Sequence, residues 1–230
     1  MAQIDGPRLA ARSRKTKQLI VFLHGFGANG DDLIALGRQW QAFMPDAAFV
    51  SPHAPEACVQ APSGRQWFGL TFRDANERWT GVNKAAPALD AFLDAELERH
   101  GLDDSKLAIV GFSQGTMMAL HVGPRRARAP AAIVGYSGEL VGPEHLEALA
   151  AQKAGKPPSI LLVHGGEDEV IPPEALFMSA EALAGANMPC QWHFSPALGH
   201  GIDGQGLRHG GLFLAGALKI RIDPALRAKM

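Results

Sequence analysis

The sequence predicts an α/β fold with a mostly parallel central sheet and helices on both of its faces. Short apolar runs recur along the chain, each typical of a strand that is covered on both faces. Segments with helical spacing of apolar residues alternate with these runs. A chain of 230 residues, 47% hydrophobic and 20% charged, can bury a substantial core. We therefore expect one domain over residues 1–230, with residues 1–17 as a peripheral N-terminal segment.

The first elements follow that segment, which is polar and irregular and has room for one short edge strand. Gln18–Leu23 is a near-continuous apolar run and predicts a buried strand, which ends in a glycine-rich loop. Asp31 and Asp32 can then cap and charge a helix that runs to about Phe43. Ala47–Val50 is the next predicted strand.

The middle of the chain is irregular before it becomes helical. Residues 56–82 show no clear periodicity, although Trp67, Phe68 and Trp79 lie among them. Apolar residues then recur at helical spacing and predict a helix that contains Leu89, Phe92, Leu93 and Leu97.

The second half repeats the alternation of strand and helix. Three further runs predict strands: Ala131–Tyr136, Ser159–His164 and Gln191–Phe194. Pro172 and Pro173 can start a helix between the last two of these strands. A glycine-rich loop, Pro196–Gly206, precedes a last helix from about Leu207 to Leu218. In such a sheet, ligands bind beyond the carboxyl ends of the strands.

One stretch places a reactive residue at a strand end of this kind. The apolar run Leu107–Val110 passes through Gly111-Phe112-Ser113-Gln114-Gly115 and continues into a predicted helix. A serine at a tight strand-to-helix turn projects its hydroxyl off the sheet, and the flanking glycines avoid collisions. The first amides of the helix point at the group that the serine attacks, where their partial positive charge favours an oxyanion. A plain turn serine is the alternative, and Ser137, without the second glycine, is predicted as a strand-end serine.

Two further residues complete a set for acyl transfer. Asp168 and His200 each follow a predicted strand, so they converge on the same sheet edge as Ser113. Serine becomes a nucleophile when a histidine takes its proton, and a carboxylate fixes the tautomer of that histidine. The order Ser, Asp, His is that of the α/β-hydrolase fold. Glu167 or Glu169 could replace Asp168.

Other polar residues fit these roles less well. His193 falls within a predicted strand and His209 within the last helix, whereas His200 lies in a glycine-flanked loop. Asp203 comes after that histidine and would break the order. His24 is predicted to shape its loop through a hydrogen bond rather than to perform chemistry.

Composition argues against several classes of function. The net charge of −1 disfavours a dedicated nucleic-acid surface, and no apolar run is long enough to span a membrane. The basic N-terminus lacks the apolar core of a secretory signal. Cys58 and Cys190 cannot form a disulfide framework and are predicted to be spectators. We expect a cytoplasmic protein without stable membrane association.

Four motifs carry a family resemblance: Leu23-His24-Gly25-Phe26-Gly27, Gly111-Phe112-Ser113-Gln114-Gly115, His164-Gly165-Gly166-Glu167-Asp168 and Gly199-His200-Gly201. Together they resemble the phospholipase/carboxylesterase family, a small α/β-hydrolase family that also contains acyl-protein thioesterases. The resemblance runs from about Gln18 to Leu218. It implies Ser113 as the nucleophile and Asp168 and His200 as its partners.

The resemblance also implies roles around this set. The backbone amides of Phe26 and Gln114 would form the oxyanion hole, and the pair Trp67-Phe68 would contact the acyl group. Two plain core aromatics are the alternative for that pair. The family often has Leu where this chain has Phe26, which bears on the shape of the acyl pocket.

We expect a serine carboxylesterase that hydrolyses short- to medium-chain esters through an acyl-enzyme, without a cofactor or metal. An acyl-protein thioesterase or lysophospholipase with the same triad is the near alternative, and a non-catalytic hydrolase fold that binds a small ligand is the distant one. No stretch resembles a long helical lid, which favours soluble substrates. The expected partner is a small-molecule ester and not a nucleic acid; a homodimer stays open.

Overall fold

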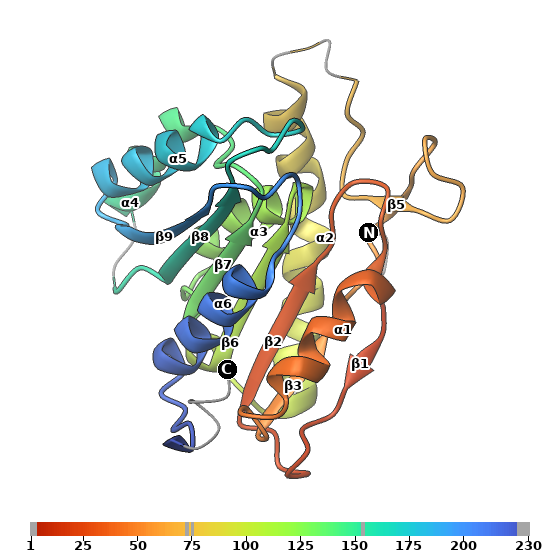
Figure 1. The fold of residues 1–230 in the computed structure, drawn as a ribbon, viewed down its shortest axis with the longest axis vertical. Coiled ribbons are helices and arrows are strands. Elements are labelled where there is room, and N and C mark those ends of the chain that lie inside the picture. Colours follow the sequence, from red (N-terminus) through yellow and green to blue (C-terminus); the bar gives the residue numbers. More distant parts are fainter. Residues whose placement is uncertain (1–3, 72–73, 75, 153–154, 225–230) are drawn as a thin grey trace.

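A computed structural model of the chain describes residues 4–71, 74, 76–152 and 155–224. At its centre lies a seven-stranded sheet in the order β1-β3-β2-β6-β7-β8-β9 (Figure 1). The strands are β1 (Arg8–Leu9), β2 (Gln18–Leu23), β3 (Ala47–Val50), β6 (Leu107–Phe112), β7 (Ala132–Tyr136), β8 (Ser159–Gly165) and β9 (Cys190–Ser195). Within this sheet, β1 pairs antiparallel with β3 and the other neighbouring strands are parallel. The predicted mostly parallel sheet is confirmed, and its strands lie within a few residues of the predicted runs.

Helices cover both faces of this sheet. Helices α1 (Gly30–Trp40) and α6 (Gly204–Ala217) lie on the front face in Figure 1, and α2 (Glu77–His100) and α3 (Gln114–Arg125) lie behind it. Side chains of β2 point alternately to the two faces of the sheet, which explains why every residue of β2 after Gln18 is apolar. Ile20 and Phe22 belong to the core that contains residues of α1 and α6, whereas Leu19, Val21 and Leu23 belong to the core that contains residues of α2 and α3.

The register brings the predicted site residues to one edge of the sheet. Leu23 pairs with Gly111 and Gly111 with Gly135, so β2, β6 and β7 end side by side. The loops that leave these strands therefore start next to one another. The loop that follows β8 starts at the same edge, because Tyr136 pairs with Val163.

Several elements differ from the prediction. The cap of α1 is Asn29, whose side chain accepts from the amide of Asp31 at 2.8 Å, while Asp32 accepts from the amide of Asn29 at 2.7 Å. Asp32 thus closes a capping box instead of capping the helix itself. Helix α6 begins before Leu207 because the side chain of Asp203 accepts from the amide of Gly206 and caps it.

Other elements were predicted only in part or not at all. Helix α2 starts within the segment that has no clear periodicity, and a small hairpin of β4 (Glu56–Ala57) and β5 (Arg65–Gln66) precedes it. A short helix, α4 (Leu146–Gln152), and two 3-10 turns, η1 (Asp104–Lys106) and η2 (Pro143–His145), also lie outside the predicted elements. Helix α5 (Glu174–Gly185) follows Pro173, which stands at the N-cap position without a capping hydrogen bond from its side chain.

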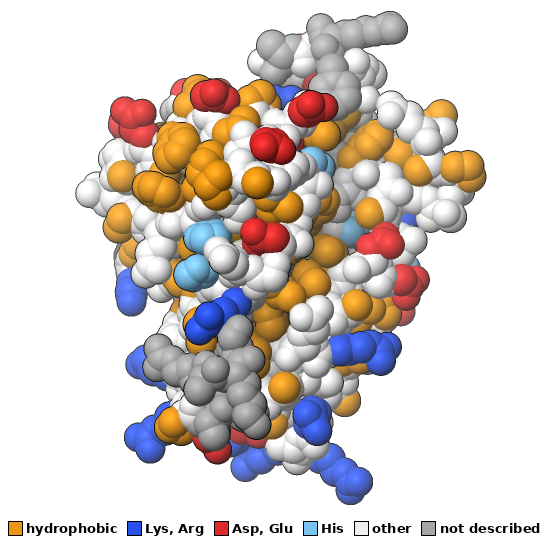
Figure 2. Space-filling model, in the orientation of Figure 1, with side chains coloured by type: hydrophobic (Ala, Val, Ile, Leu, Met, Phe, Trp, Pro, Cys, Tyr) orange, Lys and Arg blue, Asp and Glu red, His pale blue; other side chains and the backbone are white. Residues whose placement is uncertain are grey.

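In the view of Figure 2, apolar side chains gather over α5. Phe177 and Met178 of that helix are 46% and 70% exposed, and Trp192 of β9, which contacts Phe177, is 53% exposed. None of the helices in the described part of the chain is both long and apolar enough to cross a membrane.

Candidate active site

Ser113 lies at a tight turn between β6 and α3. Its backbone has φ 53° and ψ −117°, a conformation that residues other than glycine rarely adopt. Its amide donates to the carbonyl of Tyr136 at 2.9 Å, and its carbonyl accepts from the amides of Thr116 and Met117 at 2.9 and 3.2 Å. These bonds hold the strained residue from both sides.

The two glycines of the motif are required by close backbone contacts. A Cβ at Gly111 would lie 2.4 Å from the backbone of Gly115, and a Cβ at Gly115 would lie 1.9 Å from the carbonyl oxygen of Leu23. Any side chain at either position would force β6, α3 and β2 apart. The sequence predicts that a side chain at either glycine would collide with the neighbouring strand or helix, and the structure agrees at both positions.

The loop after β2 is shaped by the buried imidazole of His24. Its Nε2 accepts from the amide of Ala54 at 2.9 Å, so the proton is on Nδ1, which donates to the carbonyl of Gly25 at 2.8 Å. Burial lowers the pKa of His24 and keeps the ring neutral. A Cβ at Gly25 would lie 3.3 Å from Cβ of Ser113, which places this loop against the serine. The loop-shaping role predicted for His24 agrees with this geometry.

Gln114 contributes two separate polar groups to the turn, its backbone amide and its side chain. Its amide is the first N–H of α3 and so has no acceptor within the helix. Its side chain is buried and bridges to the chain before α2: Oε1 accepts from the amide of Trp67 at 2.9 Å, and Nε2 donates to the carbonyl of Phe68 at 2.8 Å. The contacts of the side chain were not predicted, because both of its partners are distant from it in the sequence.

Trp67 and Phe68 lie in the core. Each side chain is 1% exposed, the Trp67 indole donates to the carbonyl of His24 at 3.0 Å, and Phe68 packs on Gly81 of α2. This burial fits the alternative of plain core aromatics, since neither ring presents a free surface to solvent. Contact of either ring with an acyl group stays a prediction.

Asp168 lies in the loop after β8 and is held by several donors. Its Oδ1 accepts from the amides of Val170 and Ile171, both at 2.9 Å, and Nδ1 of His200 lies 3.0 and 2.8 Å from Oδ1 and Oδ2. Burial alone raises the pKa of Asp168, but the bonds from Ile171, His200 and Val170 outweigh it and hold that pKa below its usual value. The two alternatives for this position, Glu167 and Glu169, are exposed.

His200 is positioned over the ends of β6 and β7. Its ring centroid lies 5.0 Å from that of Phe112, and the hydroxyl of Ser137 donates to the carbonyl of Gly201 at 3.0 Å. Its Nδ1 faces Asp168, which leaves Nε2 on the other side of the ring. Among the residues described, Asp168 and His200 are joined directly, whereas Ser113 follows Phe112, whose ring contacts His200, and its hydroxyl makes no hydrogen bond.

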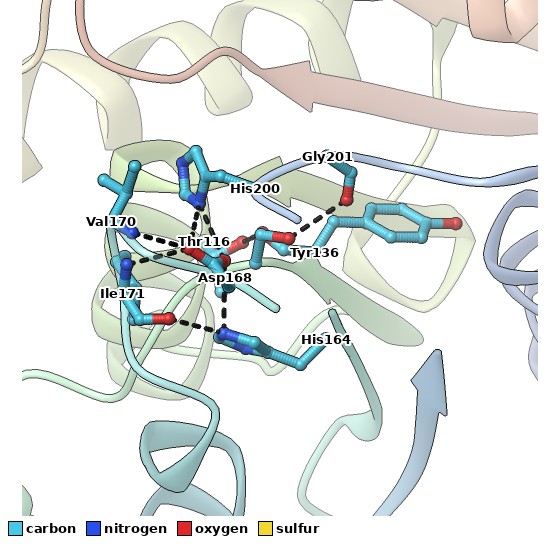
Figure 3. Close-up of polar contacts among 9 residues, drawn as sticks. Thr116, Tyr136, His164, Asp168, Val170, Ile171, His200 and Gly201 are labelled. Carbon is cyan, nitrogen blue, oxygen red and sulfur yellow. Dashed lines mark hydrogen bonds and ion pairs between the residues drawn. The ribbon is translucent and has the colours of Figure 1, made fainter. Parts of the chain in front are cut away.

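A second histidine contacts Asp168 and has no predicted role. The Nε2 atom of His164, in β8, lies 3.3 Å from Oδ2 of Asp168 and 2.9 Å from the carbonyl oxygen of Ile171 (Figure 3). Its position four residues before Asp168 in the motif was the one signal for this contact. No cluster of three or more His, Cys, Asp or Glu side chains suited to a metal ion occurs within the described ranges.

Comparisons with known proteins agree on one family. Residues 5–216 match the sequence profile of the family described as Phospholipase/Carboxylesterase. The chain is 27% identical over 195 residues to the esterase YpfH of Escherichia coli K12, covering 85% of this chain and 81% of that protein. It is 30% identical over 169 residues to acyl-protein thioesterase 1 of Schizosaccharomyces pombe, covering 71% and 74%.

Solved structures extend this agreement to the fold. Esterase PE8 superposes with a TM-score of 0.88 at 39% identity, covering 94% of this chain and 99% of that one. Acyl-protein thioesterase 2 of Zea mays, at 20% identity, shares the fold with a TM-score of 0.73 over 93% of this chain and 99% of that one. The chain therefore belongs to the phospholipase/carboxylesterase family of α/β-hydrolases.

Proposed function

We propose that the protein is a serine carboxylesterase that hydrolyses short- to medium-chain carboxylic esters through an acyl-enzyme. The observation that carries the proposal is the strained Ser113 turn beside the hydrogen-bonded pair of Asp168 and His200. The similarity to esterases and thioesterases supports hydrolysis of an acyl group.

The proposed reaction has two acyl-transfer steps. Ser113 Oγ attacks the ester carbonyl while Nε2 of His200 takes the hydroxyl proton, and Asp168 holds Nδ1–H and stabilises the imidazolium. His200 then gives the proton to the leaving alcohol, and a water molecule hydrolyses the acyl-enzyme by the same route. Hydrogen bonds of unliganded catalytic groups often tighten only when substrate binds, so the absent bond from Ser113 to His200 fits this scheme.

Two backbone amides would stabilise the oxyanion. The first amide of α3, at Gln114, has no helical acceptor and follows the nucleophile directly. The amide of Phe26 comes from the loop that lies against Ser113 through Gly25. Both donors belong to the main chain, so side-chain changes at these positions leave them in place.

A thioesterase with the same groups is the second candidate, favoured by the 30% identity to the Schizosaccharomyces pombe protein. Thioesters and oxygen esters pass through the same tetrahedral intermediate, so the substrate depends on the pocket. We further propose a cytoplasmic location, because both cysteines are free thiols.

A fluorophosphonate probe together with a substrate panel tests the proposal. We expect the wild-type protein, and not Ser113→Ala, to be labelled at the serine. Values of kcat/KM on acetate, butyrate and octanoate esters and on matching thioesters define the substrate class. Phe26→Leu keeps the amide and reshapes the wall, so it should change the preference for acyl length more than the rate on acetate. Labelling of Ser113→Ala at wild-type yield would contradict the assigned nucleophile.

A further inference from the structure

We propose that His164 is a positioning residue that holds the Asp168 carboxylate in place for His200. This inference rests on the proposed function of the Asp168–His200 pair. Figure 3 shows Asp168 between two histidine rings, with His200 on one side and His164 on the other. His200 comes from the loop after β9, and His164 comes from β8 itself.

The contacts of His164 determine which of its nitrogens carries a proton. Its Nε2 lies 2.9 Å from the carbonyl oxygen of Ile171 and 3.3 Å from Oδ2 of Asp168. Both partners are acceptors, since a carbonyl has no proton and Asp168 is ionised in contact with the donors around it. A nitrogen that faces two acceptors must be the donor, so His164 carries a proton on Nε2.

The contacts of Asp168 show what this donor adds. Oδ1 accepts from two backbone amides, while Oδ2 accepts from His200 at 2.8 Å and faces His164. Oδ1 also accepts from His200 at 3.0 Å and so has three donors, whereas on Oδ2 the contact of His164 is the only one besides that of His200 among the described residues. Without His164, Oδ2 would depend on His200 alone, the residue that it has to orient.

Burial makes the presence of this imidazole informative. His164 is 1% exposed and lies in β8, whose other buried side chains are apolar, and the Asp168 side chain is 0% exposed. A buried imidazole destabilises a protein unless it is hydrogen-bonded, and an apolar residue would fill the space without that penalty. His164 differs from an apolar residue at this position through its polar contacts with Ile171 and Asp168.

Other charged groups around His164 do not replace Asp168 as its partner. Glu139, in the loop after β7, interacts electrostatically with His164. Its carboxylate is bound by Arg78 of α2 at 2.8 Å, and burial raises the pKa of Glu139. The titratable and charged groups that can respond to a change at His164 are therefore Asp168, Glu139, Arg78 and, beyond Asp168, His200.

Removal of the His164 donor should affect the rate more than substrate binding. In His164→Leu, a carboxylate with one donor fewer orients His200 less well, so kcat should fall about tenfold to hundredfold with KM within about twofold. The same carboxylate attracts the Nδ1 proton of His200 more strongly, so the acid limb of the kcat/KM profile should move to higher pH. His164→Gln keeps an N–H near the position of Nε2 and should restore kcat to within about threefold.

The experiment compares these two variants with wild type and with His121→Leu, which removes a buried histidine that does not contact Asp168. The measurements are kcat, KM and the pH profile on p-nitrophenyl acetate, the melting temperature, and the low-field proton NMR signal of His200 Nδ1–H. His121→Leu should keep the wild-type profile and NMR signal. A loss in His164→Leu that His164→Gln restores, with a shifted NMR signal, supports the proposal.

Two results would overturn it. One is a His164→Leu variant with wild-type kcat and pH profile; the other is an equal loss in both variants that follows melting temperature and leaves the pH profile unchanged. If His164→Leu does not fold, ¹⁵N NMR of histidine in the wild-type protein decides, because an Nε2 atom of His164 that carries no proton contradicts the geometry. Full activity of Ser113→Ala would instead overturn the proposed function, so the two failures are distinguishable.

Discussion

Ser113 and Ser137 end neighbouring strands in nearly the same way. Strands β6 and β7 pair in parallel with Phe112 opposite Tyr136, and the serine that follows each has a positive φ, 53° and 44°. Each serine amide donates to the next strand along the sheet, Ser113 to Tyr136 at 2.9 Å and Ser137 to Val163 at 2.8 Å.

The two serines differ in what surrounds their hydroxyls. Ser113 is 8% exposed and is followed directly by α3, whose first amides point toward its end of the sheet. Ser137 is completely buried and its hydroxyl donates to the carbonyl of Gly201. A Cβ at Gly138 would lie 2.4 Å from Cβ of Thr116, so α3 itself crowds the turn after Ser137. Two similar strand ends thus leave the Ser137 hydroxyl hydrogen-bonded and the Ser113 hydroxyl available.

The largest expected effect is the difference between Ser113→Ala and Ser137→Ala. Ser113→Ala should lower kcat by a factor on the order of 10⁵ or more, because the triad acts as a unit. Ser137→Ala removes one hydrogen bond to the His200 loop and should keep kcat within about tenfold while it lowers stability by about 1 kcal/mol. Both are measured on p-nitrophenyl acetate with thermal unfolding as the control. Similar losses in the two folded variants would remove the distinction.

Asp168→Asn tests which acidic residue holds His200 for the reaction at Ser113, the serine with the available hydroxyl. The amide group cannot hold His200 in the required tautomer, so kcat should fall several thousandfold. Glu167→Gln and Glu169→Gln are the matched controls, since both side chains are exposed, and should stay within about twofold of wild type. A near-normal Asp168→Asn beside an inactive Glu167 or Glu169 variant would make our choice of acid wrong.

Gln114→Ala tests the residue that follows Ser113, where Ser137 has a glycine. The change leaves the buried amide of Trp67 and the carbonyl of Phe68 without partners, so the free energy of unfolding should fall by about 2–4 kcal/mol. The main-chain donor remains, so kcat should stay within about tenfold of wild type. Chemical denaturation and steady-state kinetics measure the two effects. If the folded variant instead turns over at least about a hundredfold more slowly than wild type, the side chain is the oxyanion donor.

The smallest expected effect concerns the stability of the protein in acid. It involves α3, the helix that begins directly after Ser113. Burial, with a smaller contribution from Arg125, lowers the pKa of His121 in α3 from 6.5 to about 3. The unfolded chain therefore binds a proton below pH 6.5 that the folded chain does not, and stability is lost as the pH falls from 6.5 toward 3. Between pH 6.5 and pH 5 this amounts to about 2 kcal/mol.

His121→Leu should remove that part of the acid dependence. The measurement is the slope of unfolding free energy against pH for wild type and variant, which separates titration from lost packing against Trp79. Identical slopes would show that His121 does not carry the effect.

Much of this protein is determined by local sequence patterns. The strands could be predicted because a strand covered on both faces needs an apolar residue at nearly every position, as in β2 and β6. Ser113 could be found because the glycines on either side are needed by backbone contacts that any such turn makes. Asp168 and His200 could be found because parallel strands end at one edge of the sheet.

Tertiary structure alone decided the rest. The bridge from Gln114 joins the start of α3 to Trp67 and Phe68 in a segment without sequence periodicity, and Phe68 packs on α2, whose start no pattern indicated. His164 ends a strand that is apolar on both sides of the sheet, and only the folded loop turns Asp168 back onto its ring. A side chain's partner across the fold depends on which segments meet, and that is a property of the packed chain rather than of its local pattern.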